Sequence, residues 1–185
     1  TDRFGESVAL GQLAADRPVV LVMSWFECPH LCPMVLNNLA KTINQLPFGT
    51  EGFRVVVVSI DPEETPDTAQ ALVDRLQQRH AGIPGDWTFL TGNPTAIDSL
   101  ADAVGFRYAY DEQRDSYAHP AGLVVVSPGG TVNRYLFGAR PEAPDLRLAL
   151  LEAADGELGS AIDQVVLRCY RFDVDSGRYN LAVMR

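Results

Sequence analysis

One stretch decides the fold: Val19-Val-Leu-Val-Met-Ser-Trp-Phe-Glu-Cys-Pro-His-Leu-Cys-Pro33. Its first five residues form a continuous apolar run, which is typical of a strand covered on both faces. The turn-forming Asp16-Arg-Pro18 precedes this run. Pro33 can occupy the first turn of a helix. The stretch therefore predicts a buried strand followed at once by a helix, whose apolar residues recur at helical spacing at Val35, Leu36, Leu39, Ile43 and Leu46.

The same alternation continues along the chain. An alternation of strands and helices predicts an α/β fold, a central mixed sheet with helices on both faces. A hairpin beyond the third helix makes this pattern similar to the thioredoxin-like fold with an inserted hairpin. We expect further strands at 53–60, 87–91, 121–127 and 131–137, and helices at 65–80, 93–104 and 144–154.

The chain of 185 residues is long enough for one domain. We expect this domain to span residues 1–155, and residues 156–185 to form an extension packed on it. In the extension, the turn Asp175-Ser-Gly177 predicts a hairpin between 170–174 and 178–183, while the segment from Ile162 to Cys169 fits either a helical stripe or a strand. We expect a membrane segment to follow Arg185 in the full-length protein.

The charge of the chain argues against two classes of partner. The net charge is −9 and the isoelectric point is about 4.7. Nucleic-acid binding needs a basic face, and attraction to anionic lipids needs a basic cluster. No apolar run approaches the roughly 18 residues that span a bilayer.

Three cysteines are present, and two of them are close together. Cys28 and Cys32 lie between the predicted strand and helix, whereas Cys169 lies far away. The free N–H groups at the start of a helix stabilise a thiolate, which is both a nucleophile and a metal ligand. On spacing alone, the pair could also be two small buried residues, or zinc ligands together with His30 or His80.

Further motifs give the pair a context. Cys28-Pro-His-Leu-Cys32-Pro33 after an apolar strand resembles the SCO/SenC family of copper chaperones and thiol–disulfide proteins of cytochrome oxidase assembly. The resemblance covers roughly residues 5–150. It continues through the segment from Val57 to Pro66, Leu90-Thr-Gly92, His119 before a strand, and Pro128-Gly-Gly130.

The resemblance implies a site made of Cys28, Cys32 and His119. Two thiolates and an imidazole suit copper by their softness, Cu(I) especially, and the resemblance implies that the same set also takes Cu(II). A disulfide between the cysteines would release the metal, because only reduced, deprotonated sulfur binds.

The resemblance also implies a role. It is that of a copper-binding assembly factor for the CuA site of cytochrome c oxidase, with subunit II or another copper-site protein as the partner. The alternative is a thiol–disulfide oxidoreductase that acts on partner cysteines without obligatory metal. A peroxidase ranks last, because Trp25-Phe-Glu-Cys28 lacks the Thr-x-x-Cys pattern. The family implies an extracytoplasmic location, in the periplasm or on the outer face of the inner membrane, with a membrane tether.

Several neighbouring residues have two readings. His30 stands where the family commonly has an acidic residue. It is either a solvated loop residue, a group that favours the thiolates, or a competing ligand. Asp61 follows a buried strand at the expected site, where it either forms a turn or acts on the backbone and the cysteines. Met34 is expected to pack in the core rather than to offer a soft thioether.

We expect Glu63 and Glu64 to be solvated. Trp25 and Phe26 are expected to line the site and limit water around the sulfur atoms. Cys169 is expected to be a small buried residue.

Overall fold

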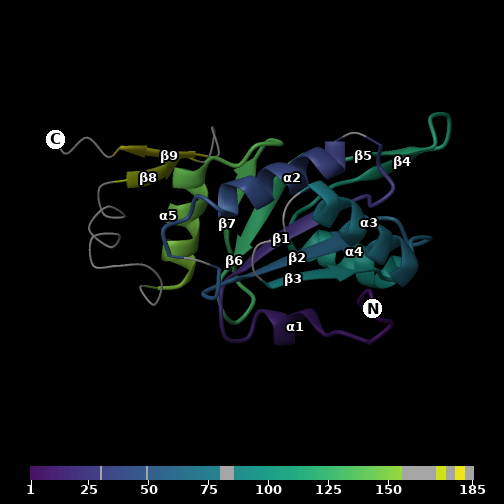
Figure 1. The fold of residues 1–185 in the computed structure, drawn as a ribbon, viewed down its shortest axis with the longest axis horizontal. Coiled ribbons are helices and arrows are strands. Elements are labelled where there is room, and N and C mark those ends of the chain that lie inside the picture. Colours follow the sequence, from purple (N-terminus) through teal and green to yellow (C-terminus); the bar gives the residue numbers. More distant parts are fainter. Residues whose placement is uncertain (30, 49, 80–85, 156–169, 174–177, 182–185) are drawn as a thin grey trace.

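A five-stranded sheet in the order β3-β2-β1-β6-β7 forms the centre of the molecule (Figure 1). The computed structural model describes residues 1–29, 31–48, 50–79, 86–155, 170–173 and 178–181. The strands of this sheet are β1 (Val19–Ser24), β2 (Arg54–Ser59), β3 (Asp86–Leu90), β6 (Gly122–Val126) and β7 (Val132–Phe137).

The sheet is mixed, as the alternation predicts. β1 pairs in parallel with β2, and β2 in parallel with β3. On the other side of β1, β6 and β7 add two antiparallel strands. β1 therefore lies in the middle, and all six of its residues are buried.

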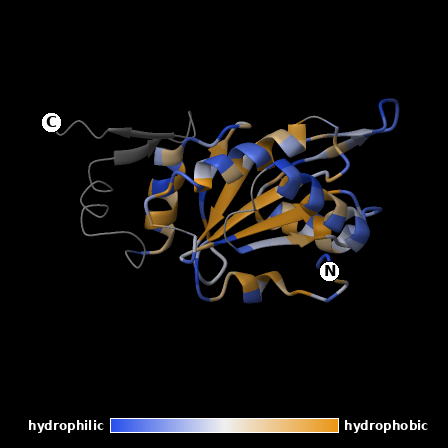
Figure 2. Ribbon diagram, viewed as in Figure 1, coloured by the Kyte–Doolittle hydropathy of each residue, from blue (hydrophilic) through white to orange (hydrophobic). Residues whose placement is uncertain are grey.

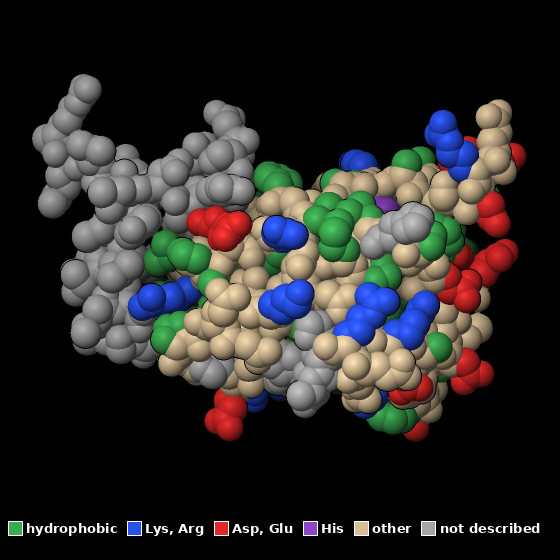
Figure 3. All heavy atoms as spheres, turned by 45° about the horizontal axis from the view of Figure 1, so that its top comes forward, with side chains coloured by type: hydrophobic (Ala, Val, Ile, Leu, Met, Phe, Trp, Pro, Cys, Tyr) green, Lys and Arg blue, Asp and Glu red, His purple; other side chains and the backbone are tan. Residues whose placement is uncertain are grey.

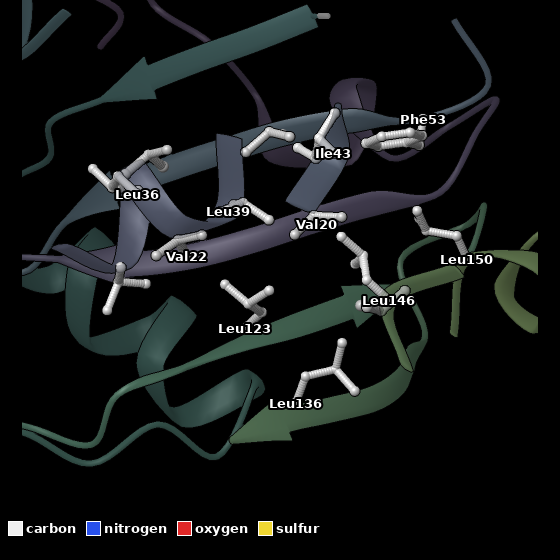
Figure 4. Packing of buried hydrophobic residues seen from close by; sticks show 14 of the residues in the cluster. Val20, Val22, Leu36, Leu39, Ile43, Phe53, Leu123, Leu136, Leu146 and Leu150 are labelled. Atoms are coloured by element: carbon white, nitrogen blue, oxygen red, sulfur yellow. The ribbon is translucent and has the colours of Figure 1, made fainter. Parts of the chain in front are cut away.

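One face of the sheet is covered by α2 (Leu31–Ile43), α3 (Pro66–Arg79) and α5 (Ala143–Ala153). The apolar side of α2 meets β1 directly: Leu36 and Leu39 are fully buried, and they lie over Val20 and Val22 (Figure 4). The central strands are hydrophobic, whereas the helices carry hydrophilic residues on the sides that face away from the sheet (Figure 2).

The other face is covered by α4 (Pro94–Ala103) and by the short α1 (Leu10–Leu13). Asn93 caps α4, because its side chain accepts a hydrogen bond from the backbone N–H of Ala96 at 2.9 Å. Helices on both faces and the thioredoxin-like α/β fold are thus confirmed.

Two helices differ from the sequence prediction, one in where it begins and one in that it was not expected. α2 begins at Leu31, two residues before Pro33. Pro33 in the first turn removes no helical hydrogen bond. The N–H groups of the first turn have no partner within the helix, and an N–H is the group that proline lacks. The four-residue α1 was not predicted at all.

A second small sheet was also not predicted. β4 (Ala109–Asp111) and β5 (Ser116–Ala118) form a separate antiparallel hairpin that projects from one end of the molecule (Figure 1). The alternation of Tyr108, Tyr110 and Tyr117 with small or polar residues around an acidic turn was the available signal.

The C-terminal hairpin has its strands where they were expected. β8 (Tyr170–Asp173) pairs with β9 (Arg178–Leu181), and β9 lies beside α5. The predicted turn at 175–177 and the segment that contains Cys169 lie outside the described residues. The division into residues 1–155 and an extension stays a prediction. In the described part of the chain, no helix is both long and apolar enough to cross a bilayer.

Candidate functional site

The loop that carries Cys28 leaves the sheet at the carboxyl ends of two parallel strands. Ser24 of β1 is opposite Ser59 of β2, so the segments that follow these strands emerge side by side. The backbone N–H of Ile60 donates to the Ser24 carbonyl at 3.1 Å and holds the two segments together. Open α/β sheets place their functional groups at this edge.

The strand order brings His119 to the same edge. β6 runs antiparallel to β1, with Leu21 opposite Val124, so the start of β6 lies near the end of β1. His119 lies between β5 and β6 and therefore reaches the loop after β1.

Cys32 and His119 are in contact. The Sγ atom of Cys32 lies 3.4 Å from Nε2 of His119, although 87 residues separate them in the sequence. Cys32 is in the first turn of α2 and is only 3% exposed.

The contact made by the other ring nitrogen, Nδ1, determines which nitrogen of His119 carries the hydrogen. Nδ1 lies 2.9 Å from the carbonyl oxygen of Pro120. A carbonyl oxygen only accepts hydrogen bonds, so Nδ1 carries the hydrogen in this pair. In the neutral ring, Nε2 then presents its lone pair to Cys32, which is the arrangement of a metal-ligating histidine.

Cys28 is placed differently from the other two residues. It is half-buried in the loop before α2, and its backbone N–H donates to the Trp25 carbonyl at 3.3 Å. Cys28 and Cys32 are both free thiols. Within the described residues, no three His, Cys, Asp or Glu side chains lie close enough together to hold a metal ion. The structure therefore brings together two of the three predicted ligands, and His30 lies outside the residues described.

Phe106 packs beside His119, and a second aromatic pair lies in the neighbouring segments. The ring of Phe106 lies 5.9 Å from the imidazole, and Trp25 packs edge-on against Tyr117 at 5.7 Å. Phe26 is fully buried and packs against Phe89 in the core, rather than lining the site.

The expectation that Glu64 is solvated was wrong. Glu64 is 6% exposed, and its carboxylate accepts hydrogen bonds from the backbone N–H groups of Phe26 at 3.1 Å and Glu27 at 2.7 Å. The Ser59 hydroxyl donates a third. Burial raises the pKa of Glu64 to about 6, and these hydrogen bonds oppose the rise. Glu64 thus fixes the backbone immediately before Cys28.

Asp61 acts on the segment that leads to His119. Its carboxylate accepts a hydrogen bond from the N–H of Glu63 at 2.9 Å, as in an ordinary turn. It also bonds the side chain of Tyr117, whose pKa is raised mainly by burial and further by Asp61. Tyr117 is two residues before His119, so Asp61 fastens β5 to the end of β2.

Met34 also lies elsewhere than expected. Its side chain is 45% exposed on the outer side of α2, rather than packed in the core. The helical spacing around it explains this, because the apolar stripe follows Val35, Leu36 and Leu39 and leaves position 34 outside.

Curated proteins with related sequences include one that is named for copper binding. A Stutzerimonas stutzeri protein, named as a candidate copper-binding protein, is 31% identical over 121 residues, which are 63% of this chain and 56% of that protein. The matches span about a third to just over half of the lengths of the curated relatives.

Several solved structures share the fold. A candidate electron-transfer protein of Aquifex aeolicus superposes with a TM-score of 0.72 at 23% identity, over 85% of this chain and 89% of that one. Arabidopsis thaliana ScoI, solved with copper bound, gives a TM-score of 0.66 at 19% identity, over 83% and 93%. The model of the SCO1/SenC family matches residues 1–148, and this chain therefore belongs to the SCO1/SenC family.

Proposed function

We propose that this protein binds copper through Cys28, Cys32 and His119 and delivers it to the CuA site of cytochrome c oxidase subunit II or to another copper-site protein. The observation that carries the proposal is the 3.4 Å contact between Cys32 Sγ and His119 Nε2. A relative named as a candidate copper-binding protein and a copper-bound structure of the same fold support it.

The donor set suits the metal. Thiolates are soft ligands that select Cu(I), and imidazole also suits copper. Because Nδ1 of His119 is tied to the Pro120 carbonyl, Nε2 is free to bind the metal, and the ring is held in one orientation.

Cys28 supplies the third ligand in this proposal. It lies four residues before Cys32, and its side chain must turn toward the pair for all three atoms to meet one ion. Glu64 holds the backbone of Phe26 and Glu27, so this turn is confined to the end of the loop. Oxidation of the two thiols to a disulfide removes both sulfur ligands and releases the metal.

A second function is favoured by the unequal burial of the two thiols. Cys28 is half-buried and Cys32 is buried, as in a pair with one attacking and one resolving cysteine. The Cys28 thiolate would attack a partner disulfide, form a mixed disulfide and release one partner thiol. Cys32 would then attack the Cys28 sulfur and release the second, so that two electrons pass to the partner. Titration against redox buffers tests this function, and two free thiols in the oxidised protein would exclude it.

Copper binding by the fully reduced protein tests the proposal. Titration against a chromophoric Cu(I) chelator is expected to give one copper per chain for the wild type. His119→Ala should weaken the affinity at least about tenfold, because even the loss of a group that only orients a ligand costs that much. His80→Ala, which removes a histidine of another segment, is the matched control. Unchanged stoichiometric affinity of the His119→Ala protein would overturn the three-ligand site.

We further propose that the protein works outside the cytoplasm, on a membrane tether. The proposal rests on the family resemblance. Fractionation of cells that express the full-length protein tests it, and recovery in the cytoplasmic fraction would contradict it.

A further inference from the structure

A groove of about 430 Å³ lies between α2 and α3, beside the thiol of Cys28. We call it the basic groove, because Lys41, Arg75 and Arg79 line it together with Cys28. Leu72 and Leu76 of α3 contribute an apolar part, and the exposed Met34 lies at its rim. Within the described residues, no aspartate or glutamate lines this groove.

The three cations of the basic groove stand out in an acidic protein. The chain carries a net charge of −9, yet basic side chains gather across the middle of the face formed by α2 and α3 (Figure 3). Among the ion pairs of the described residues, none involves Lys41, Arg75 or Arg79. Three like charges without acidic partners attract a negatively charged ligand.

Arg75 links this charge to the loop that carries Cys28. One of its guanidinium nitrogens donates to the Phe26 carbonyl at 3.0 Å, two residues before Cys28. The positive charge is therefore held next to the segment that positions the more exposed thiol. Lys41 and Arg79 lie in the last turns of their helices, where cations also stabilise a helix end. That role explains two positions, but it does not explain why all three cations face one groove with Cys28.

We propose that the basic groove docks an acidic segment of the partner protein and aligns the partner's cysteine with Cys28. This inference rests on the proposed function, since it requires a cysteine-bearing partner for copper or for disulfide exchange. An acidic segment is favoured by charge complementarity, and the apolar side chains of Leu72 and Leu76 can contact its non-polar atoms. Specificity then comes from the groove, and the chemistry comes from the two thiols.

The rate of thiol–disulfide exchange measures the docking directly. The probes are two synthetic peptides, each a symmetrical disulfide dimer, in which the cysteine is flanked by Asp and Glu in one and by Lys in the other. The reduced protein gives two electrons to the dimer, forms the Cys28–Cys32 disulfide and releases two peptide thiols. At low salt the acidic peptide should react roughly tenfold faster or more than the basic one, and salt of about 0.5 M should reduce the difference.

Charge reversal separates docking from general electrostatics. The double variant Lys41→Glu/Arg79→Glu should slow the acidic peptide and speed up the basic one. The control Arg107→Glu/Arg114→Glu changes the net charge equally, at side chains 80% and 81% exposed around the β4–β5 hairpin. The control should keep the preference of the wild type for the acidic peptide.

Three results would overturn the inference: equal rates for the two peptides, the same effect of both double variants, or no reaction of the wild type with either peptide. Copper titration of the reduced wild type is run in parallel. Discrimination between the peptides without copper binding would leave the groove standing and reject the copper role. Copper binding without discrimination between the peptides would reject the groove as a docking site and leave the copper role standing.

Discussion

Glu64 places a carboxylate inside the molecule because three donors meet it there. Two of these donors are the backbone N–H groups of Phe26 and Glu27, in the loop that leads from β1 to Cys28. A carboxylate that accepts such bonds pins the chain more firmly than a neutral group would. The same burial makes its ionisation costly.

Glu64 is expected to make stability depend on pH. Its pKa in the folded protein is about 6, above the usual 4.5, so the folded state binds the extra proton between these values. The contribution of Glu64 is therefore fully present below about pH 4.5 and is lost as the pH rises through about 6, by on the order of 2 kcal/mol.

Urea unfolding of the wild type and of Glu64→Gln, from pH 4 to pH 8, checks this dependence. The stability of the wild type relative to the variant should fall across that window. Glu63→Gln removes the neighbouring exposed carboxylate and should leave the fall unchanged. A relative stability that is flat or rises with pH would contradict the assignment.

At this scale the sequence indicated the site residues but not all of their neighbours. Cys28, Cys32 and His119 stand in recognisable motifs, and the structure brings two of them into contact. Glu64 lies in the polar run Asp-Pro-Glu-Glu-Thr, which has the composition of a solvated turn. Its burial depends on backbone groups of a distant loop, and no local pattern contains them.

The helix α2 shows how one element serves both the core and the site. Its N-terminus carries Cys32, its inner side packs on β1, and its outer side borders the basic groove. The hydrogen bond from Asn38 to the Ala139 carbonyl and that from Thr42 to the Pro141 carbonyl fasten its C-terminal half to the segment before α5. A shift of this helix would move Cys32 relative to His119.

Substitutions on the two sides of α2 should differ sharply. Leu36→Ala removes a fully buried side chain and is expected to lower the free energy of unfolding by about 2–5 kcal/mol. Met34→Ala, on the exposed side of the same turn, should change it by less than about 0.5 kcal/mol. Denaturant unfolding at one pH measures both values, and equal losses would show that the helix faces another way.

Most elements were predictable because they bury enough apolar surface to leave a periodic pattern. β1 and β2 are continuous apolar runs, and α2 carries a clear helical stripe. α1 has four residues, and β4 and β5 have three each, so they are too short for a period to repeat. Their conformations depend on tertiary contacts, such as the packing of Tyr108 and Tyr117 against the second face of the sheet.

On the scale of the whole molecule, two apolar clusters flank one sheet. As described, the clusters consist of residues between Val8 and Ala154. A domain ending near residue 155 therefore contains every described part of the core.

A chain of residues 1–155 is expected to unfold in one cooperative transition. Its midpoint should lie close to that of the full chain, because residues 1–155 contain the described core on both faces of the sheet. Thermal unfolding followed by circular dichroism compares the two. A truncated chain that lacks a cooperative transition would show that the extension belongs to the same folding unit.

The 87 residues between Cys32 and His119 have a consequence for the newly made chain. Synthesis proceeds at roughly 5–20 residues per second, so the histidine follows the second thiol by roughly 4–17 s. β6, which brings His119 to its place, must also insert beside β1 before the two side chains meet. During that interval the nascent polypeptide carries two sulfhydryl groups without the imidazole beside them. An oxidant that reacts with them in this interval forms the disulfide before His119 is in place.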